Sequence, residues 1–358
     1  MCSGDPTMYE RYWQQMGEKS TVVIPGWKFI SYFSDVNNLC WFLEPEFANA
    51  VVRLHDFVGN AVTKDRHIIV GSGSSQLFQA ALYALSQPNN DSEPINVVSA
   101  APYYSSYLPI IELVKSGLYK WGGDARFFKP DKPYIELVTS PNNPDGYSRR
   151  AVVNQSQLGM LIHDFAYYWP QYIAITSRAD HDLMLFTVSK STGHAGSRLG
   201  WAIVKNREVA KKMTDFVVLN TIGVSKESQI RAAKILQSII DSHKDTKVEA
   251  FFEHTFDLMA ARWKKLRDVI NKSEIFTLPK YSPETCSFSG RTFATQPAFA
   301  WVKCKGEEVE DCGSFLRNHG IISRSGTHFG ESGKYVRISV VPQDRVFEQF
   351  VGRLSTIG

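Results

Sequence analysis

From about residue 46 the chain alternates between segments with helical spacing of apolar residues and short continuous apolar runs. Residues 46–60 predict one helix, and residues 76–87 predict another after a glycine-serine turn. Short apolar runs predict strands at 67–70, 95–100, 134–139, 160–163, 183–188 and 199–204. Because these strands alternate with helical or loop crossovers, the pattern predicts a mostly parallel sheet covered on both faces.

Beyond residue 205 the pattern is mainly helical. Ser225 stands at a helix N-cap position, and residues 247–272 continue the helical spacing. Two strands at 298–304 and 335–341 and a short helix at 343–355 complete the chain. We therefore expect an α/β protein with three parts: an amino-terminal arm at 1–45, a large domain at 46–225 and a smaller α/β domain at 226–358.

The composition is that of a folded globular protein, with 43% apolar and 21% charged residues. Its 40 basic and 36 acidic residues give a formal net charge of +4, spread along the chain, which makes no case for nucleic acid or a membrane surface. No apolar run approaches the roughly 18 residues that span a bilayer, and the first residues contain no signal-peptide core. We expect a cytoplasmic protein.

The cysteines show neither the spacing of a disulfide framework nor that of a metal site. They are odd in number, widely spaced and without a CxxC pair: Cys2, Cys40, Cys286, Cys304 and Cys312. We expect reduced thiols and no zinc or other metal site.

Polar or glycine-rich groups follow nearly every predicted strand, where ligands bind in open parallel sheets. The turn GSGSS at 71–75 opens a helix, so its backbone N–H groups and the hydroxyls of Ser74 and Ser75 could hold a phosphate. A tight turn with a serine N-cap is the simpler interpretation of this motif alone. The aromatics of APYYSSY at 101–107 could stack on a flat ring or pack in the core.

Two further groups carry side chains that suit a ligand. Asn143 lies in the turn-forming stretch SPNNPDG, and Asp164 directly follows an apolar run, with Tyr167 three residues later. A carboxylate beside an apolar run needs a cationic or N–H partner to remain charged. A plain loop and a helix N-cap are the alternatives.

The stretch TVSKSTGHAGSRLGW places Lys190 and Arg198 between two apolar runs. A lysine amine in a desolvated pocket can form an imine with a carbonyl, and arginine suits a phosphate dianion. Together the five groups fit one ligand that is flat, phosphorylated, aldehyde-bearing and basic at a ring nitrogen. Pyridoxal 5′-phosphate meets each requirement.

The motifs SPNNPDG, DFAYYW and SKSTGHAGSRLGW resemble those of fold-type I pyridoxal-phosphate aminotransferases, and more narrowly the plant tryptophan aminotransferase and alliinase group. The resemblance runs from about residue 3 to residue 355. It implies a mostly parallel central sheet between helices, a smaller carboxy-terminal α/β domain, and a homodimer with its site at the subunit interface. The arm at 1–45 would contribute to the small domain and to that interface.

The resemblance also implies a role for each matched residue. Lys190 matches the Schiff-base lysine, and Asp164 the aspartate at the pyridine nitrogen. Tyr167 and Asn143 match the groups that hydrogen-bond the ring oxygen, and Tyr104 matches the aromatic residue that stacks on the ring face. The phosphate-binding groups match Ser74, Ser75, Thr187, Ser189 and Arg198. Tyr32 resembles a further cofactor contact, serving its own or the neighbouring subunit, and Arg337 matches the arginine that binds the substrate carboxylate.

The implied reaction is transamination of L-tryptophan with pyruvate to give indole-3-pyruvate and L-alanine, a step of auxin biosynthesis. The alternatives are an alliinase-like C–S lyase acting on cysteine sulfoxides and an aminotransferase of broader aromatic specificity. The lyases carry a cysteine-rich module that this sequence lacks, which favours the aminotransferase. A catalytically inactive binding protein is disfavoured because Lys190, Asp164 and Arg198 are all present. Aromatic residues near the start could line the substrate pocket or pack in the core: Phe33, Trp41 and Phe42.

Overall fold

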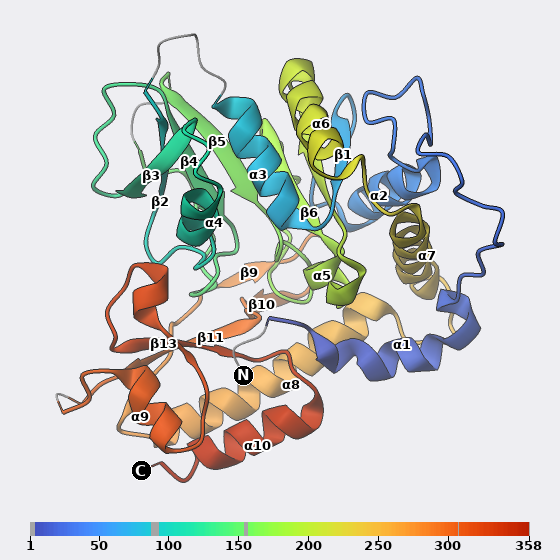
Figure 1. Ribbon diagram of the computed structural model, residues 1–358. Helices are drawn as coiled ribbons and strands as arrows, with labels where there is room; N and C mark the ends of the chain where they lie inside the picture. The colour runs from blue at the N-terminus through green and yellow to red at the C-terminus, as the bar shows by residue number, and fades with distance from the viewer. Residues whose placement is uncertain (1–3, 87–92, 154–156, 307, 358) are drawn as a thin grey trace.

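A seven-stranded sheet forms the centre of the larger part of the molecule (Figure 1). The computed structural model describes residues 4–86, 93–153, 157–306 and 308–357. In spatial order the strands are β1 (His67–Gly71), β7 (Gly200–Val204), β6 (Leu183–Thr187), β5 (Gly159–Asp164), β4 (Tyr134–Thr139), β2 (Ile95–Ser99) and β3 (Tyr119–Asp124). Strands β6, β5, β4, β2 and β3 run parallel to one another, whereas β7 is antiparallel to both β6 and β1. The predicted mostly parallel sheet is confirmed.

Helices cover both faces of this sheet. Every residue of β4, β6 and β7 is buried, and successive strand residues point to opposite faces, so each face must be covered. The helices of this part are α2 (Pro45–Val58), α3 (Ser74–Leu85), α4 (Tyr107–Val114), α5 (Val188–Ser191), α6 (Arg207–Thr221) and α7 (Lys226–Ser242). Helix α3 packs on α6, and α2 packs on α7.

A smaller antiparallel sheet lies beside the large one (Figure 1). In spatial order its strands are β12 (Arg324–Ser325), β13 (Tyr335–Ser339), β11 (Phe299–Cys304) and β8 (Phe276–Thr277). Its helices are α8 (Phe251–Lys272), α9 (Cys312–Asn318) and α10 (Asp344–Leu354). The strands β9 (Pro283–Thr285) and β10 (Thr292–Ala294) form a separate hairpin. The buried Arg262 of α8 donates to the carbonyl oxygens of Val340 and Pro342 at 2.7 Å, which attaches α8 to the end of β13.

The first described residues, Gly4 and Asp5, line a cavity between the two sheets, and the following segment runs from there to α1 (Figure 1). Helix α1 (Glu10–Met16) follows a short turn, and the indole N–H of Trp13 donates to the Thr192 carbonyl at 2.9 Å. The backbone N–H of Met8 donates to the Val341 carbonyl at 3.2 Å. These bonds attach the first residues both to the segment after β6 and to the small sheet.

The elements predicted from apolar runs are confirmed with shifts of a few residues at their ends. Ser225 caps α7 as predicted, because its side chain accepts from the Ser228 N–H at 3.2 Å. Strands β3, β8, β9, β10 and β12 were not predicted, since β3 contains two glycines and two charged residues and each of the other four is only two or three residues long. None of the helices in the described ranges is both long and apolar enough to cross a membrane.

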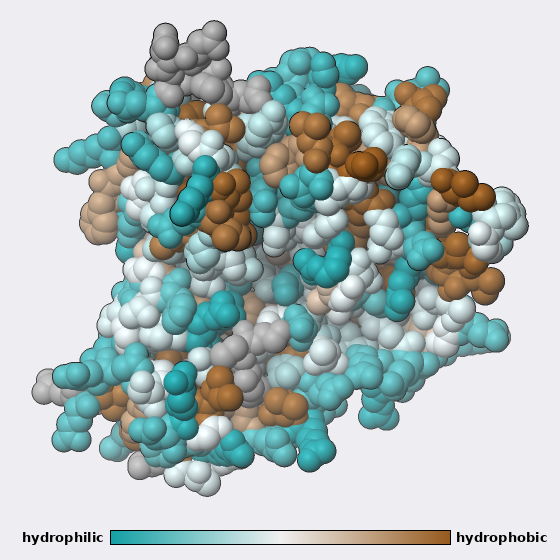
Figure 2. All heavy atoms as spheres, viewed as in Figure 1, coloured by the Kyte–Doolittle hydropathy of each residue, from teal (hydrophilic) through white to brown (hydrophobic). Residues whose placement is uncertain are grey.

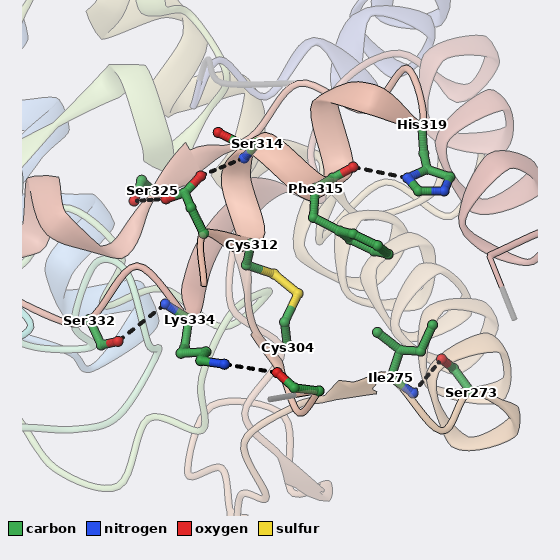
Figure 3. The surroundings of a disulfide bond; sticks show 12 residues. Ser273, Ile275, Cys304, Cys312, Ser314, Phe315, His319, Ser325, Ser332 and Lys334 are labelled. Carbon is green, nitrogen blue, oxygen red and sulfur yellow. Dashed lines mark hydrogen bonds between the residues drawn. A yellow bond between two sulfur atoms is a disulfide. The ribbon is translucent and has the colours of Figure 1, made fainter. Parts of the chain in front are cut away.

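One pair of cysteines is bonded, contrary to the prediction of reduced thiols. Cys304 at the end of β11 and Cys312 at the start of α9 form a disulfide across a separation of 8 residues (Figure 3). The chain between them turns back so that α9 begins beside the end of β11, a proximity that the spacing alone did not indicate. Cys40 and Cys286 are free and buried, and Cys2 lies outside the described residues. The cytoplasmic location stays a prediction, and the disulfide removes the support that reduced cysteines would have given it.

Candidate active site

One cavity of about 330 Å³ brings together every predicted site residue except Tyr32. It lies where β4, β5 and β6 end at the carboxyl edge of the large sheet, and the small sheet closes its other side. The predicted residues that line it are Ser74, Ser75, Tyr104, Asn143, Asp164, Tyr167, Thr187, Ser189, Lys190, Arg198 and Arg337. The sequence separation of these residues is large, so the fold itself assembles the site.

Helix α3 begins at this cavity without a side-chain cap. Its N-cap residue, Gly73, has φ +83 and no side chain that could accept from the first N–H groups. A Cβ on Gly73 would lie 2.8 Å from Nη2 of Arg198, so a larger residue here would displace that guanidinium from its position at the helix start. Open N–H groups at a helix start beside an arginine form an anion-binding site.

Hydroxyl groups complete the same end of the cavity. The side chain of Thr187 accepts from the Ser189 N–H at 3.2 Å and lies 3.1 Å from the Ser189 hydroxyl. Thr187 also donates to the Leu199 carbonyl at 3.0 Å, which connects the segment after β6 to the segment before β7. The positions of both hydroxyls are therefore fixed by the backbone.

The amine of Lys190 lies inside the cavity. Its Nζ donates to the Gly4 carbonyl at 2.8 Å. Burial lowers the pKa of Lys190 to about 8; nearby Asp5 opposes this shift, and Arg337 and Arg198 add to it. At neutral pH an appreciable fraction of this amine is therefore unprotonated and nucleophilic.

The carboxyl group of Asp164 lies at the end of β5, deep in the cavity. It accepts from the Ala166 N–H at 3.0 Å and from the Tyr107 hydroxyl at 3.2 Å. Burial raises the pKa of Asp164, and these two hydrogen bonds and Lys190 partly offset the effect. No helix begins after Asp164 in this part of the described chain, so the alternative of a helix N-cap is wrong. Asp164 lines the cavity, where a cation would favour its ionised form.

Arg337 reaches the cavity from the small sheet. This buried residue of β13 donates from Nη1 to Oδ1 of Asn143 at 3.0 Å, and its Cζ lies 4.0 Å from the ring centre of Phe299. Phe299 in turn packs edge-on against Tyr167 with ring centres 5.7 Å apart. A guanidinium held by an amide and an aromatic face suits a carboxylate ligand.

The loop that carries Asn143 is fixed by its polar neighbours. Nδ2 of Asn142 donates to the Pro102 carbonyl at 2.9 Å, and Asp145 forms a 2.6 Å ion pair with Arg149. Arg149 also donates to the Ala100 carbonyl at 2.8 Å. The loops after β2 and β4 are therefore joined, which sets the position of Tyr104 relative to Asn143.

Tyr32 and the aromatics near it lie outside this cavity. The Tyr32 side chain is 66% exposed, and its assignment as a cofactor contact, of its own or of the neighbouring subunit, stays a prediction. Phe42 is buried in the core, and Phe33 and Trp41 pack on each other with ring centres 4.8 Å apart. Of the two interpretations offered for these aromatics, core packing holds for Phe42.

Sequence reasoning missed several lining or contact residues: Gly4, Asp5, Tyr107, Phe299 and Arg324. Tyr107 ends the motif APYYSSY, which follows a predicted strand. Its closeness to Asp164 could therefore have been predicted, because Asp164 lies at the end of another strand of the same sheet. Arg324 gave no signal, because its strand is two residues long and only the register with β13 brings it to the cavity.

The model of the alliinase family, described as allinase, matches residues 1–358. The chain is 58% identical over 354 residues to tryptophan aminotransferase-related protein 2 of Arabidopsis thaliana, covering 99% of this chain and 80% of that protein. It is 37% identical over 361 residues to an alliin lyase of Allium cepa var. aggregatum, covering 98% of this chain and 79% of that protein.

Solved structures agree with this grouping at the level of the fold. An aminotransferase from Staphylococcus aureus has a TM-score of 0.69 at 17% identity, covering 99% of this chain and 92% of that one. Similarity at this identity supports the architecture alone. The chain therefore belongs to the alliinase family, and it has the fold of the fold-type I pyridoxal-phosphate aminotransferases.

Proposed function

We propose that this protein is a pyridoxal-phosphate-dependent aminotransferase that converts L-tryptophan and pyruvate to indole-3-pyruvate and L-alanine, as in auxin biosynthesis. The observation that carries the proposal is the buried Lys190 amine in one cavity with Asp164 and Arg337. The name of the 58% identical relative supports tryptophan as the donor.

The residues of the cavity fit pyridoxal 5′-phosphate. A buried carboxyl group with a raised pKa, Asp164, faces the space where a basic ring nitrogen would supply the missing cation. Tyr104 would lie against the ring face, and Tyr167 and Asn143 near the ring oxygen. The phosphate would be held by Ser74, Ser75, Thr187, Ser189 and Arg198. When bound, the cofactor supplies an electron sink that acidifies the α-carbon of an amino acid.

Lys190 is the proposed acid-base group. With a pKa near 8, Nζ can accept the proton from the α-carbon of the amino acid and hold it. In the second half of the cycle the same atom returns a proton to the α-carbon of the product amino acid. The Gly4 carbonyl and Asp5 lie beside Nζ and favour its protonated form.

Arg337 is the proposed substrate-orienting group. Its guanidinium can form two parallel hydrogen bonds to the α-carboxylate, which fixes the direction of the bond to be broken. The predicted homodimer would place Tyr32 of each chain at its neighbour's cavity.

The deciding experiment is product identification. The purified protein is incubated with tryptophan, tyrosine or phenylalanine plus pyruvate, and the keto acid formed is identified. We expect indole-3-pyruvate to form fastest, dependent on pyruvate. Equal rates with all three donors would indicate broader aromatic specificity, whereas ammonia and pyruvate from a cysteine sulfoxide would indicate the C–S lyase and overturn the proposal.

Replacement of Lys190 tests the catalytic assignment. Lys190→Ala should lower turnover at least about 10²–10⁴-fold, since a positioned acid-base group contributes that much. It should also abolish covalent attachment of the cofactor after borohydride reduction, read by peptide mass. Lys211→Ala on the exposed surface of α6 is the control; normal turnover in Lys190→Ala would contradict the assignment.

A further inference from the structure

A chain of hydrogen bonds connects Asp164 to two hydroxyl groups at the carboxyl edge of the large sheet. Oδ2 of Asp164 lies 3.2 Å from the Tyr107 hydroxyl, which lies 2.6 Å from Oγ1 of Thr139. Asp164 ends β5 and Thr139 ends β4, and the two residues are directly paired in the parallel register. Tyr107 begins α4, so three separate elements bring the three oxygens together. Tyr107 and Thr139 are both buried.

Packing fixes the position of the central hydroxyl. The Tyr107 ring lies against Phe78, with ring centres 5.0 Å apart, and meets Tyr104 edge-on at 5.4 Å. Burial and the neighbouring Asp164 raise the pKa of Tyr107 well above its ordinary value, so its hydroxyl stays neutral. The other carboxyl oxygen, Oδ1, accepts from the Ala166 N–H at 3.0 Å. Each oxygen of Asp164 thus has a donor, and the two donors set the orientation of the carboxyl group.

The direction of this chain depends on the protonation of Asp164. A hydroxyl group carries one hydrogen and can also accept, whereas an ionised carboxylate only accepts. When Asp164 is ionised, Thr139 donates to Tyr107 and Tyr107 donates to Asp164. When Asp164 is protonated on Oδ2, it can donate to Tyr107, which then donates to Thr139. Both directions keep the two hydrogen bonds by rotation of hydroxyl hydrogens, without movement of heavy atoms.

We propose that Tyr107 is a positioning residue that, together with Thr139, holds the ionised form of Asp164 toward the ring nitrogen of the cofactor. The inference rests on the cofactor use proposed above and adds two hydroxyl groups to that site. A hydrogen bond to a charged group is worth more than one between neutral groups. The chain therefore favours the carboxylate of Asp164 over its carboxylic acid.

Lys190 and Tyr167 also face Asp164 from the cavity. Lys190, in the segment after β6, favours the ionised carboxyl group, whereas burial raises the pKa of Tyr167, in the segment after β5, so that it stays neutral. The charge on Lys190 changes as its amine takes up or releases a proton, so its support for the carboxylate is not constant. The Tyr107 hydroxyl keeps its hydrogen and supports the carboxylate in either state of Lys190.

The test compares two ligands on the whole chain freed of cofactor: pyridoxal 5′-phosphate and its analogue with carbon in place of the ring nitrogen. The analogue cannot form a ring cation, so its complex favours protonated Asp164. The quantity measured is the affinity for the cofactor divided by the affinity for the analogue, from fluorescence titrations. The state of the unliganded protein cancels in this ratio. Tyr107→Phe, which keeps the ring, should lower the ratio about 10-fold.

Two further variants accompany this one. Thr139→Val should lower the ratio about 2- to 3-fold, because Thr139 acts by polarising the Tyr107 O–H. The double variant should fall no further than Tyr107→Phe alone, since the second hydroxyl acts through the first. Tyr103→Phe is the matched control and should leave the ratio unchanged, because it removes a hydroxyl of the same motif from a ring that packs on Trp121, with ring centres 4.9 Å apart.

Three outcomes would overturn the proposal: an unchanged ratio in Tyr107→Phe, an equal fall in Tyr103→Phe, or a further fall in the double variant. If Tyr107→Phe yields no folded protein, Thr139→Val decides, because valine has nearly the shape of threonine. An unchanged ratio in that variant would refute the role of the hydroxyl chain. Failure of the wild-type protein to bind either ligand would count instead against the proposed function, on which this inference rests.

Discussion

The reactive amine of Lys190 is surrounded by charges of both signs. Because burial lowers its pKa to about 8, the unprotonated fraction rises with pH through that value and is about a tenth at pH 7. An ordinary lysine with a pKa near 10.4 would be well under a hundredth unprotonated at pH 7.

This difference predicts the pH dependence of cofactor capture. The rate at which apoprotein attaches pyridoxal 5′-phosphate, trapped with borohydride and mapped to Lys190, should rise with a midpoint near pH 8. Asp5→Asn should move the midpoint to lower pH, because Asp5 favours the protonated amine. A midpoint near pH 10 in both proteins would show that burial does not set the reactivity of this lysine.

The close approach of Gly73 and Arg198 leads to a second residue-scale prediction. Gly73→Ala should weaken cofactor affinity about 10-fold or more, since the new methyl group would lie 2.8 Å from Nη2 of Arg198. The measurement is a fluorescence titration of apoprotein with pyridoxal 5′-phosphate.

Gly59→Ala is the control for a positive φ alone. Gly59 has φ +72 and no heavy atom within 4 Å of the added Cβ, but its ψ of 25 is left-handed helical, whereas the ψ of 168 at Gly73 is adopted almost only by glycine. A loss of affinity on Gly73→Ala that is equally large in an Arg198→Ala background would assign the effect to strain and not to Arg198.

At this scale the sequence was informative where a site residue belongs to a contiguous motif. Lys190, Asp164 and Asn143 follow predicted strands, so the strand-end argument placed them together. Arg324 and Asp5 could not be found in this way. Their positions depend on the register of a two-residue strand and on where the amino-terminal segment crosses the molecule.

Among the elements, α7 offers a direct test of a capping prediction. Ser225→Ala removes the acceptor for the Ser228 N–H and should lower the free energy of unfolding by about 1 kcal/mol, measured by urea titration. Ser225→Asp should retain most of the stability because aspartate caps equally well. If both variants lose the same amount, the hydroxyl has a role other than capping.

Strands and long helices were predictable because their burial is nearly uniform or strictly periodic. All six residues of β4 are buried, and all of them except Glu136 and Thr139 are apolar or aromatic, which gives the signal seen in the sequence. Strand β3 lies at the edge of the sheet with one buried residue, so its sequence carries little apolar signal. The Cys304–Cys312 disulfide likewise depends on how α9 turns back on β11, which no local pattern records.

For the whole molecule, apolar side chains exposed on the segment 22–36 support the predicted homodimer. Ile30 is 86% exposed and Val36 71% exposed, and hydrophobic surface is visible at the edge of the molecule where this segment runs (Figure 2). Exposed apolar groups gathered on one segment are typical of a protein interface.

The sedimentation mass tests this prediction. The wild-type protein should sediment at twice 40.4 kDa, and the double variant Ile30→Glu, Val36→Glu should shift toward the monomer at micromolar concentration. Leu113→Glu, at an exposed apolar position on α4, is the control that should remain dimeric. A wild-type protein that sediments as a monomer would refute the dimer.

The reversed direction of β7 determines which of the proposed site residues belong to the same sheet. The chain leaves β6 and enters β7 at the same edge of the sheet. Lys190 and Arg198 therefore lie in one short connecting segment, whose two ends are held together by the pairing of β6 with β7. Arg324 and Arg337 belong to the other sheet altogether. A shift of the small sheet relative to the large sheet would therefore move the arginine proposed to bind the substrate carboxylate without moving Lys190 or Arg198, the residues proposed to bind the cofactor.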